Sequence, residues 1–523
     1  SRSLSILGIL DLKAQLDGVD VTAQLIPSQS TWTAYTGTSF YLTAGNHTIN
    51  FMAINRAGGD KSSTLDNVRI AGTGAISDTA TSIAVTASSG LSLGNGSVAR
   101  SIGGLSLSAG GSTTALTLSN GAGLVLNGDS SNNAISATGT SGQTASIIPG
   151  SSAPSLIIAT GKNISVDSGV NLTIQSVIAG PSVVSKIGAG TLTLSGANTY
   201  AGATTISAGT LNLTGNLSGG TAITIDGTGV FTQGAASVIS GSSSLTKNTS
   251  DTTTLSGANT YTGATTINAG TLNLTGNLTG GTAITINGTG VFTQGAASVI
   301  SGTSSLTKNT ADTTTLSGVN AYNGTTTVNA GTLAIGATQT LGAITGSGNL
   351  SLGSGFTLTS NAASSATFSG VVSGSGNLAK AGTGTFTLNG SNTYTGTTTI
   401  SAGTLQMANA NSLGSGGNIT FGGGALQYGS GITTDISSRL KNSASAILID
   451  TNSNNVTFAS NLGSTNSGGL TKTGAGTLIL GTDNTYSGTT TVNAGTLQLS
   501  GNISSSALTV ATGGNISIGT NSS

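Results

Sequence analysis

The sequence predicts an all-β protein, with a right-handed parallel β-solenoid preceded by a small antiparallel β-sandwich. Small and turn-forming residues dominate its 523 positions, of which 83 are glycine. Glutamate is absent and the other good helix formers are scarce, which disfavours helices. Beyond residue 185 a motif recurs, and the short apolar–polar alternations inside it have the length of strands.

The first element is the sandwich module, which we place at residues 1–75. Residues 1–78 carry 11 of the 28 charged residues, together with the single tryptophan and the single histidine. Residues 40–51 read as two strands around a turn, and residues 63–70 read as a strand after a Gly-Gly-Asp turn. The fall in charge places a domain boundary at residues 71–78.

The second element is a tandem repeat with the pattern Y-x-G-x-T-T-[IV]-x-A-G-T-L. Its copies start at Tyr200, Tyr261, Tyr322, Tyr394 and Tyr486, so the first two intervals are equal and the two later ones are longer. Residues 195–247 and 256–308 differ at only 5 of 53 positions. Such near-identity indicates a recent tandem duplication.

Inside the repeat, a coil of about 20 residues returns the chain to the same face. Leu192 and Leu194 alternate with threonine and recur, at one and the same offset, as Leu211 and Leu213. The interval between successive tyrosines of the regular copies is therefore close to three coils, with Leu, Ile, Val and Thr inside and Gly and Asn at positive-φ corners. Over residues 76–523, coils stacked about 4.8 Å apart predict an elongated rod on the order of 100 Å.

The segment from Lys472 to Leu497 resembles the passenger-associated repeat of bacterial autotransporters. It reads K-T-G-A-G-T-L-I-L-G-T-D-N-T-Y-S-G-T-T-T-V-N-A-G-T-L, and five copies lie between about Lys186 and Leu499. The resemblance implies a β-helical passenger that is secreted and displayed at the cell surface. More weakly, residues 28–70 resemble the last strands of galactose-binding-like carbohydrate-binding jelly rolls. We expect further segments of a longer precursor to flank this chain.

Composition excludes several classes of function. Charged residues make up 5% of the chain, the formal net charge is +0, and no basic cluster occurs, so nucleic-acid binding lacks its electrostatic footprint. The absence of cysteine excludes disulfides, thiolate metal sites and cysteine nucleophiles. No apolar run approaches the roughly 18 residues that a membrane-spanning helix needs. We predict no cofactor and no metal.

Few residues are candidates for chemistry. Trp32, Tyr35 and Tyr41 are the candidate glycan-binding platform, although aromatic residues of a small sandwich are more often core. His47 lies in an alternating strand without a Ser or Asp constellation, and we assign it a structural role. Residues 127–133 are rich in oxygen ligands but lack the spacing of a calcium loop.

Two residue types recur at fixed positions of the repeat. One reading of the lysines is a cationic stripe for anionic glycans; we favour isolated, solvated surface charges, because copies three coils apart lie about 14 Å from one another. We expect the repeat tyrosines to pack at a corner rather than to form a binding ladder. The lysines are Lys186, Lys247, Lys308, Lys380 and Lys472.

These observations predict a non-enzymatic extracellular or cell-surface protein, a bacterial stalk or fibre subunit with an adhesive role and no catalytic residues. The alternative is a glycan-active β-helix enzyme with a charged cleft formed by Asp435, Arg439, Lys441 and Asp450. As partners we expect further copies of the chain, assembled end to end, and cell-surface or matrix glycans. An incomplete sandwich and a last coil near Val510–Ile518 without a charged edge favour such assembly.

Overall fold

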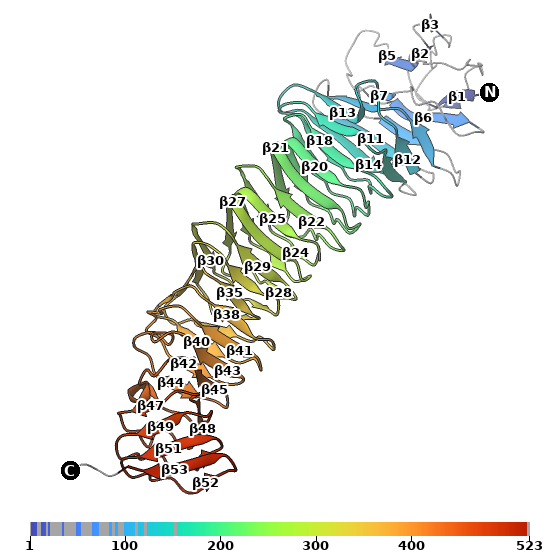
Figure 1. The fold of residues 1–523 in the computed structure, drawn as a ribbon. Coiled ribbons are helices and arrows are strands. Elements are labelled where there is room, and N and C mark those ends of the chain that lie inside the picture. Colours follow the sequence, from blue (N-terminus) through green and yellow to red (C-terminus); the bar gives the residue numbers. More distant parts are fainter. Residues whose placement is uncertain are drawn as a thin grey trace. The chain divides into compact units, whose positions relative to one another are not determined.

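The computed structural model describes residues 99–109, 113–119, 123–150 and 154–519, and it also places the strand backbones of eight earlier segments. Those eight segments are residues 2–7, 12–16, 19–20, 34–35, 49–53, 65–72, 83–85 and 89–92. The chain divides into two compact units, Ser1–Leu272 and Asn273–Ser523. Unit 1 and unit 2 are each a stack of β-strands (Figure 1).

The described strands of unit 1 are mostly short, and β25 extends past Leu272. They are β1 (Arg2–Leu7), β2 (Leu12–Leu16), β3 (Val19–Asp20), β4 (Ala34–Tyr35), β5 (Ile49–Ala53), β6 (Leu65–Gly72), β7 (Ile83–Val85), β8 (Ser89–Ser92), β9 (Arg100–Ile102), β10 (Leu105–Ala109), β11 (Thr113–Ser119), β12 (Gly123–Leu126), β13 (Asn133–Gly139), β14 (Thr144–Pro149), β15 (Ser155–Ile158), β16 (Asn163–Val166), β17 (Asn171–Ile174), β18 (Val184–Ile187), β19 (Thr191–Leu194), β20 (Thr204–Leu213), β21 (Ala222–Gln233), β22 (Ser244–Lys247), β23 (Thr252–Leu255), β24 (Ala258–Asn259) and β25 (Thr265–Leu274).

Unit 2 continues with the same kind of strand and contains one short 3-10 helix. Its elements are β26 (Asn277–Leu278), β27 (Ala283–Gln294), β28 (Ser301–Gly302), β29 (Ser305–Lys308), β30 (Thr313–Leu316), β31 (Ala321–Tyr322), β32 (Thr326–Val328), β33 (Thr332–Ile335), β34 (Gln339–Leu341), β35 (Ile344–Gly346), β36 (Asn349–Leu352), β37 (Thr357–Ser360), β38 (Ala366–Phe368), β39 (Val372–Gly374), β40 (Asn377–Lys380), β41 (Thr385–Leu388), β42 (Thr398–Ile400), β43 (Thr404–Met407), β44 (Ile419–Phe421), β45 (Ala425–Tyr428), η1 (Ser437–Arg439), β46 (Ile447–Asp450), β47 (Val456–Phe458), β48 (Leu470–Thr473), β49 (Thr477–Leu480), β50 (Thr490–Val492), β51 (Gly495–Leu499), β52 (Leu508–Val510) and β53 (Gly514–Ile518).

The first six strands pair differently from the rest. Strand β1 is antiparallel to β4 and β6, and β2 is antiparallel to β3 and β5. The segments that join these strands lie outside the described residues. The antiparallel sandwich over residues 1–75, and its boundary at residues 71–78, therefore stay predictions.

From β7 onwards the described strand pairs are parallel, and their register shows how the chain advances from coil to coil. In unit 1, Thr204 aligns with Ile223, Ile223 with Leu245, and Leu245 with Thr265. Three steps thus carry the chain from Thr204 to Thr265, which is the same position one repeat later. The prediction of a parallel solenoid with three coils per repeat is confirmed, whereas its right-handed sense stays a prediction.

A coil of unit 1 contributes to three parallel ladders. The first joins β18, β20, β21 and β22, and the second joins β17, β19, β20 and β21 through the far halves of the two long strands. The third is a line of single bridges through Asn198, Leu217 and Ile239. Each coil therefore has three sides, one in each ladder, with a corner between neighbouring sides.

Unit 2 is built in the same way. One ladder joins β29, β32 and β35, and another joins β30, β33, β36 and β39. A third runs through β28, β31, β34, β37, β40, β42 and β44. Within the part of the chain that the structure describes, no α-helix occurs.

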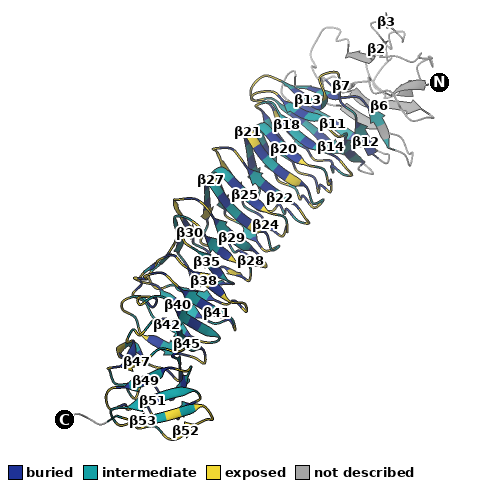
Figure 2. Cartoon of the chain, viewed as in Figure 1, coloured by how far each residue is buried: buried dark blue, intermediate teal, exposed yellow. Residues whose placement is uncertain are grey.

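The core is a column of apolar side chains that stack from coil to coil. Leu192 aligns with Leu211 and Leu211 with Phe231, and each of the three is at most 1% exposed. In β19, and likewise in β22, β33 and β41, buried residues alternate with half-buried ones, and Figure 2 shows buried segments along the stack. Alternation along a strand and stacking between strands together explain why the apolar residues recur once in every coil.

Glycine in the A-G-T-L part of the repeat forms one corner. The five residues have φ between 61° and 66° (Gly209, Gly270, Gly331, Gly403 and Gly495). A Cβ on Gly209 would overlap the carbonyl oxygen of Gly190 in the preceding coil. The predicted positive-φ corners are confirmed for glycine but not for asparagine, since the described asparagines with positive φ (Asn132, Asn442 and Asn452) lie outside the five repeat copies. At Gly209 the close packing of coils requires glycine as much as the dihedral angle does.

Candidate functional site

The repeat lysines lie inside the solenoid, so the expectation of solvated surface charges was wrong. Their exposed fractions are 0% for Lys186, Lys247, Lys308 and Lys472 and 1% for Lys380. Lys186 aligns with the buried Ile206 of the next coil. The lysine thus occupies an inward position of its strand, and its long side chain carries the ammonium from the core to the polar backbone of the corner.

At three corners the ammonium binds backbone carbonyls of two successive coils. Lys186 Nζ donates to the oxygens of Ile187 (2.9 Å), Gly188 (2.6 Å) and Ala208 (3.1 Å), and Ala208 belongs to the next coil. Lys472 Nζ repeats this set with Thr473 (2.7 Å), Gly474 (2.8 Å) and Ala494 (3.1 Å). Lys380 donates to Gly382 and Ala402. Three acceptors match the three N–H groups of an ammonium.

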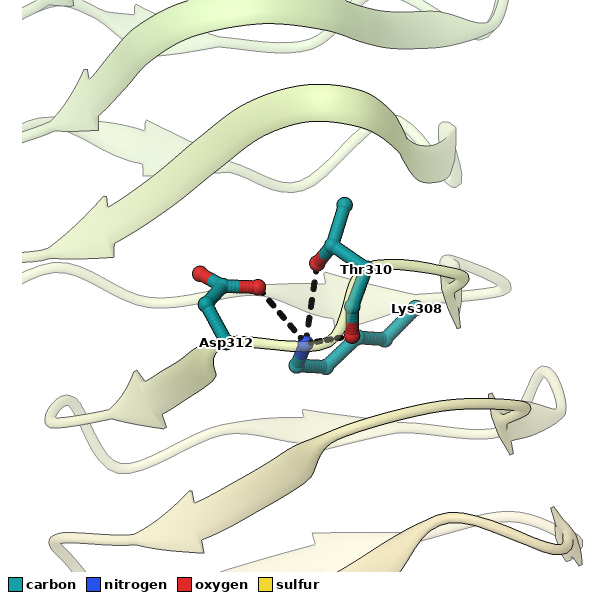
Figure 3. Close-up of polar contacts among 3 residues, drawn as sticks. All are labelled: Lys308, Thr310 and Asp312. Atoms are coloured by element: carbon teal, nitrogen blue, oxygen red, sulfur yellow. Dashed lines mark hydrogen bonds and ion pairs between the residues drawn. The ribbon is translucent and has the colours of Figure 1, made fainter.

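At the other two corners the acceptors come from the turn that follows the lysine. Lys308 Nζ donates to the carbonyl oxygen (2.6 Å) and Oγ1 (2.9 Å) of Thr310 and to Oδ1 of Asp312 (3.0 Å), as Figure 3 shows. Lys247 Nζ makes the first two of these bonds with Thr249, at 2.6 and 3.0 Å. The Asp312 side chain is 38% exposed, so one end of this ion pair reaches solvent.

Burial changes the acid–base behaviour of these corners. Desolvation lowers the pKa of Lys186 to about 8, and it also lowers the pKa of Lys472 to about 8 although the charge of Asp450 acts in the opposite direction. Burial acts to raise the pKa of the Asp312 carboxyl, but hydrogen bonds from Thr310 and Lys308 outweigh it and the pKa falls. At neutral pH the Lys186 and Lys472 amines are therefore still largely protonated, and the Asp312 carboxyl is ionised.

The repeat tyrosines are packed at a different corner, as expected. Each is at most 2% exposed, and each hydroxyl lies 2.7 or 2.8 Å from Oγ1 of the threonine four positions later. Burial raises the pKa of Tyr261 and of Tyr394 to about 12. These side chains are buried structural groups and present no binding ladder to solvent.

An asparagine two positions before each tyrosine was missed as a structural residue, because the sequence suggested only a turn. Asn198 is buried; its Oδ1 accepts the N–H of Ile178 in the preceding coil (3.0 Å) and its Nδ2 donates to Gly196 (2.8 Å). The same position accepts a backbone N–H at four further copies, Asn259, Asn320, Asn392 and Asn484. The constant position of this asparagine, two residues before each tyrosine, was the sequence signal that could have indicated a structural role.

The charged residues proposed for the enzyme alternative form hydrogen bonds with the backbone and side chains of neighbouring turns and coils. Arg439 donates to the carbonyls of Leu413, Gly414 and Gly417. Asp435 accepts the N–H groups of Ser437 and Ala459. Asp450 accepts Gln427 Nε2 (2.7 Å) and the N–H of Asn452 (2.8 Å), and Lys441 is half-buried. These bonds join neighbouring coils and turns.

The remaining candidates give no site in the described residues. Asp129 Oδ1 accepts the N–H groups of Ser131 and Asn133, both at 2.9 Å, which closes the oxygen-rich loop. Among the residues with a described placement, no three His, Cys, Asp or Glu side chains gather as metal ligands. Trp32, Tyr35, Tyr41 and His47 lie outside the residues whose side chains are described.

The parallel strand register and the buried apolar column define the class of protein: it is a parallel β-solenoid built from tandem repeats. Comparison with protein families then assigns the repeat, because residues 184–213, 245–274, 306–335, 378–407 and 470–499 match the passenger-associated-transport-repeat. Each match contains one corner lysine, one buried asparagine and one Tyr–Thr pair. Five copies of this repeat on a parallel β-solenoid support an autotransporter passenger repeat protein.

Two other comparisons add no relative. Neither the curated proteins nor the solved structures gave a match. Of the helices in the described part of the chain, none has the length and apolar character needed to cross a membrane.

Proposed function

We propose that the chain is a non-enzymatic structural stalk, secreted or held at the surface of a bacterium, that spaces an adhesive module from its anchor. One observation carries this proposal. The duplicated segment corresponds to three complete coils, so each added copy lengthens the stack without changing the register of the ladders. A spacer tolerates such copying, whereas a unique catalytic site gains nothing from it.

Deleting residues 245–305 tests the spacer role, because the cut removes one whole repeat and joins Ser244 to Leu306. We expect a folded protein that is shorter by about 14 Å in small-angle scattering, since three coils at about 4.8 Å are lost. Deleting residues 245–274 is the matched control, because it removes one and a half coils and should disrupt folding. Equal behaviour of the two deletions, or a compact globular intact chain, would overturn the proposal.

The enzyme alternative is tested separately. Purified chain is incubated with a panel of neutral and acidic polysaccharides, and products are followed by reducing ends and by unsaturated uronate absorbance. Activity that is lost on Asp435→Ala or Arg439→Ala would replace the structural proposal. Their bonds to turns favour the structural role.

Adhesion is assigned to residues 1–75. The aromatic residues Trp32, Tyr35 and Tyr41 are its proposed glycan platform, because aromatic rings stack on the apolar faces of sugars. Replacing each with Ala should abolish binding on a glycan array without changing the thermal unfolding of the solenoid. Unchanged glycan binding by all three variants would refute the assignment of these residues to glycan binding.

We also propose end-to-end assembly between copies of the chain. Strand β52 exposes Leu508 (46%) and Val510 (46%), and strand β53, in another ladder, exposes Ile518 (82%). A strand from a second copy can pair with such an edge. Defined oligomers or filaments that disappear in Val510→Lys support assembly, whereas a strictly monomeric chain at high micromolar concentration refutes it.

A further inference from the structure

We propose that each repeat corner is a binding site for a monovalent cation, which the lysine of the same repeat fills with its own ammonium group. Five such corners recur, and the lysine side chain is no more than 1% exposed in every one. The site would be the cradle of oxygen atoms, and the lysine its built-in ligand. No assigned property of the repeat requires this, and the inference does not depend on the proposed stalk function.

The cradle at Lys186 consists of three backbone oxygens. Two belong to the turn after the lysine, Ile187 and Gly188, and the third, Ala208, is on the following coil. Carbonyl dipoles that point at one buried position offset part of the desolvation cost of a positive charge there. Since three neutral oxygens supply no formal charge, the set suits a monovalent cation of ammonium size better than a divalent metal ion, which prefers carboxylates.

The residues two and four positions after the lysine decide the type of cradle. Lys186, Lys380 and Lys472 are followed by glycine at both positions, in a K-x-G-x-G segment, and their ammonium groups reach an alanine carbonyl of the next coil. Lys247 and Lys308 are followed by K-N-T-x-D, and their ammonium groups bind the threonine of their own turn. Within this chain, the residues two and four positions after the lysine are therefore either both glycine or threonine and aspartate.

The change is chemically consistent. In the first type, the glycine backbone exposes carbonyls, and the acceptor from the next coil completes the set. In the second type, threonine adds a hydroxyl acceptor, and at Lys308 the carboxylate of Asp312 adds a charged one at 3.0 Å. We infer that the first cradle uses its cation to hold two coils together, whereas the second uses it to close its own turn.

Chemical rescue of a truncated lysine tests the cradle. The variant Lys186→Ala lacks the Cγ, Cδ, Cε and Nζ atoms, and n-propylammonium is the missing fragment. We expect the thermal midpoint of this variant to rise with n-propylammonium concentration until the site is saturated. The neutral alcohol n-propanol, which has the same number of heavy atoms, should give a much smaller rise, because it brings one donor and no charge to the carbonyls.

A matched control separates the site from general salt effects. Lys162 is half-buried, and its Nζ binds Asn132 Oδ1 at an exposed position, so Lys162→Ala creates no enclosed cradle. Lys162→Ala should show no saturable rise with n-propylammonium. An equal response of Lys162→Ala and Lys186→Ala, or equal rescue by n-propanol, would overturn the proposal.

The second cradle type gives an independent test. Lys308→Ala keeps the Asp312 carboxylate, so it should bind n-propylammonium about threefold more tightly than Lys308→Ala/Asp312→Asn. Equal affinities for the two variants would mean that the residue at the fourth position does not shape the cradle.

If Lys186→Ala does not fold, the variant Lys186→Met tests whether the ammonium group joins the two coils. Methionine fills most of the volume but offers no donor, so we expect faster hydrogen exchange of amides beside Ala208 in the next coil. Hydrogen exchange that matches the wild type would show that the ammonium does not join the coils.

Discussion

The corner after Lys186 and the corner after Lys308 occupy the same position of the repeat but bind the lysine differently. At Lys186 the acceptors are three carbonyls, one of them on the next coil. At Lys308 they are a threonine and an aspartate of the same turn. The comparison shows that the repeat specifies an inward cation at this position, while the acceptors can come from either source.

The glycine at the fourth position explains why the two solutions are not interchangeable. A Cβ on Gly190 would overlap the carbonyl oxygens of Asp167 and Val170 in the preceding coil. The corresponding residue after Lys308 is Asp312, whose side chain reaches solvent at 38% exposure. The packing of the preceding coil therefore determines which residue the corner accepts.

The largest expected effect comes from forcing one corner into the sequence of the other. Gly190→Asp should lower the free energy of unfolding by about 4 kcal/mol, because a side chain must enter space that backbone occupies. The reverse change, Asp312→Gly, should cost no more than about 1 kcal/mol. Urea denaturation of the two variants measures this, and similar midpoints would mean that the corners are equivalent.

A smaller effect distinguishes where each lysine acts. Lys472→Met removes donors from the carbonyls of Thr473, Gly474 and Ala494 and should cost about 2–3 kcal/mol. Its hydrogen exchange should accelerate in the next coil near Ala494. Lys308→Met should instead accelerate exchange only in residues 309–312. Faster hydrogen exchange at the same positions of the coil in both variants would contradict the difference between the two corners.

The pH dependence of stability should reveal the buried lysines. Lys186 and Lys472 have a folded pKa of about 8, below the ordinary value of 10.5, so between these values the unfolded chain binds more protons than the folded chain. Their contribution to stability therefore rises as the pH increases from about 8 to about 10. Denaturation across that range should show a smaller rise in Lys186→Met/Lys472→Met than in wild type; parallel curves would contradict the assignment.

Measurements at still higher pH report on a different group. The folded pKa of Tyr261 and of Tyr394 is about 12, above the ordinary value of 10.0, so the unfolded chain loses tyrosine protons first. Stability must then fall as the pH rises beyond about 10. The lysine effect is therefore measured below that point.

The smallest effect is expected at the exposed end of the second corner. Asp312→Asn should lower the free energy of unfolding by less than about 1 kcal/mol, because the pair with Lys308 is open to solvent and Thr310 keeps two of the three hydrogen bonds. The loss should shrink further at high salt. A cost that exceeds that of Lys472→Met would show that the carboxylate, not the threonine, dominates this corner.

Much of the fold could be predicted, because the signals for it are local. Alternation in Thr191–Leu194 predicts a strand with one buried face, and its recurrence at residues 210–213 predicts the coil. Gly209 marks a corner through its conformational freedom. The roles of Lys186 and Asn198 could not be read in this way, since both residue types usually face solvent and turns.

The sequence by itself determined the strands, the length of the coil and the corners, because alternation, period and glycine placement act on neighbouring residues. Only the tertiary structure decided that the repeat lysine is buried. Its burial depends on acceptors that folding brings to it, such as the carbonyl of Ala208 on the following coil. A charged side chain is stable in a core when its hydrogen bonds are met there, and whether they are met depends on how the coils stack.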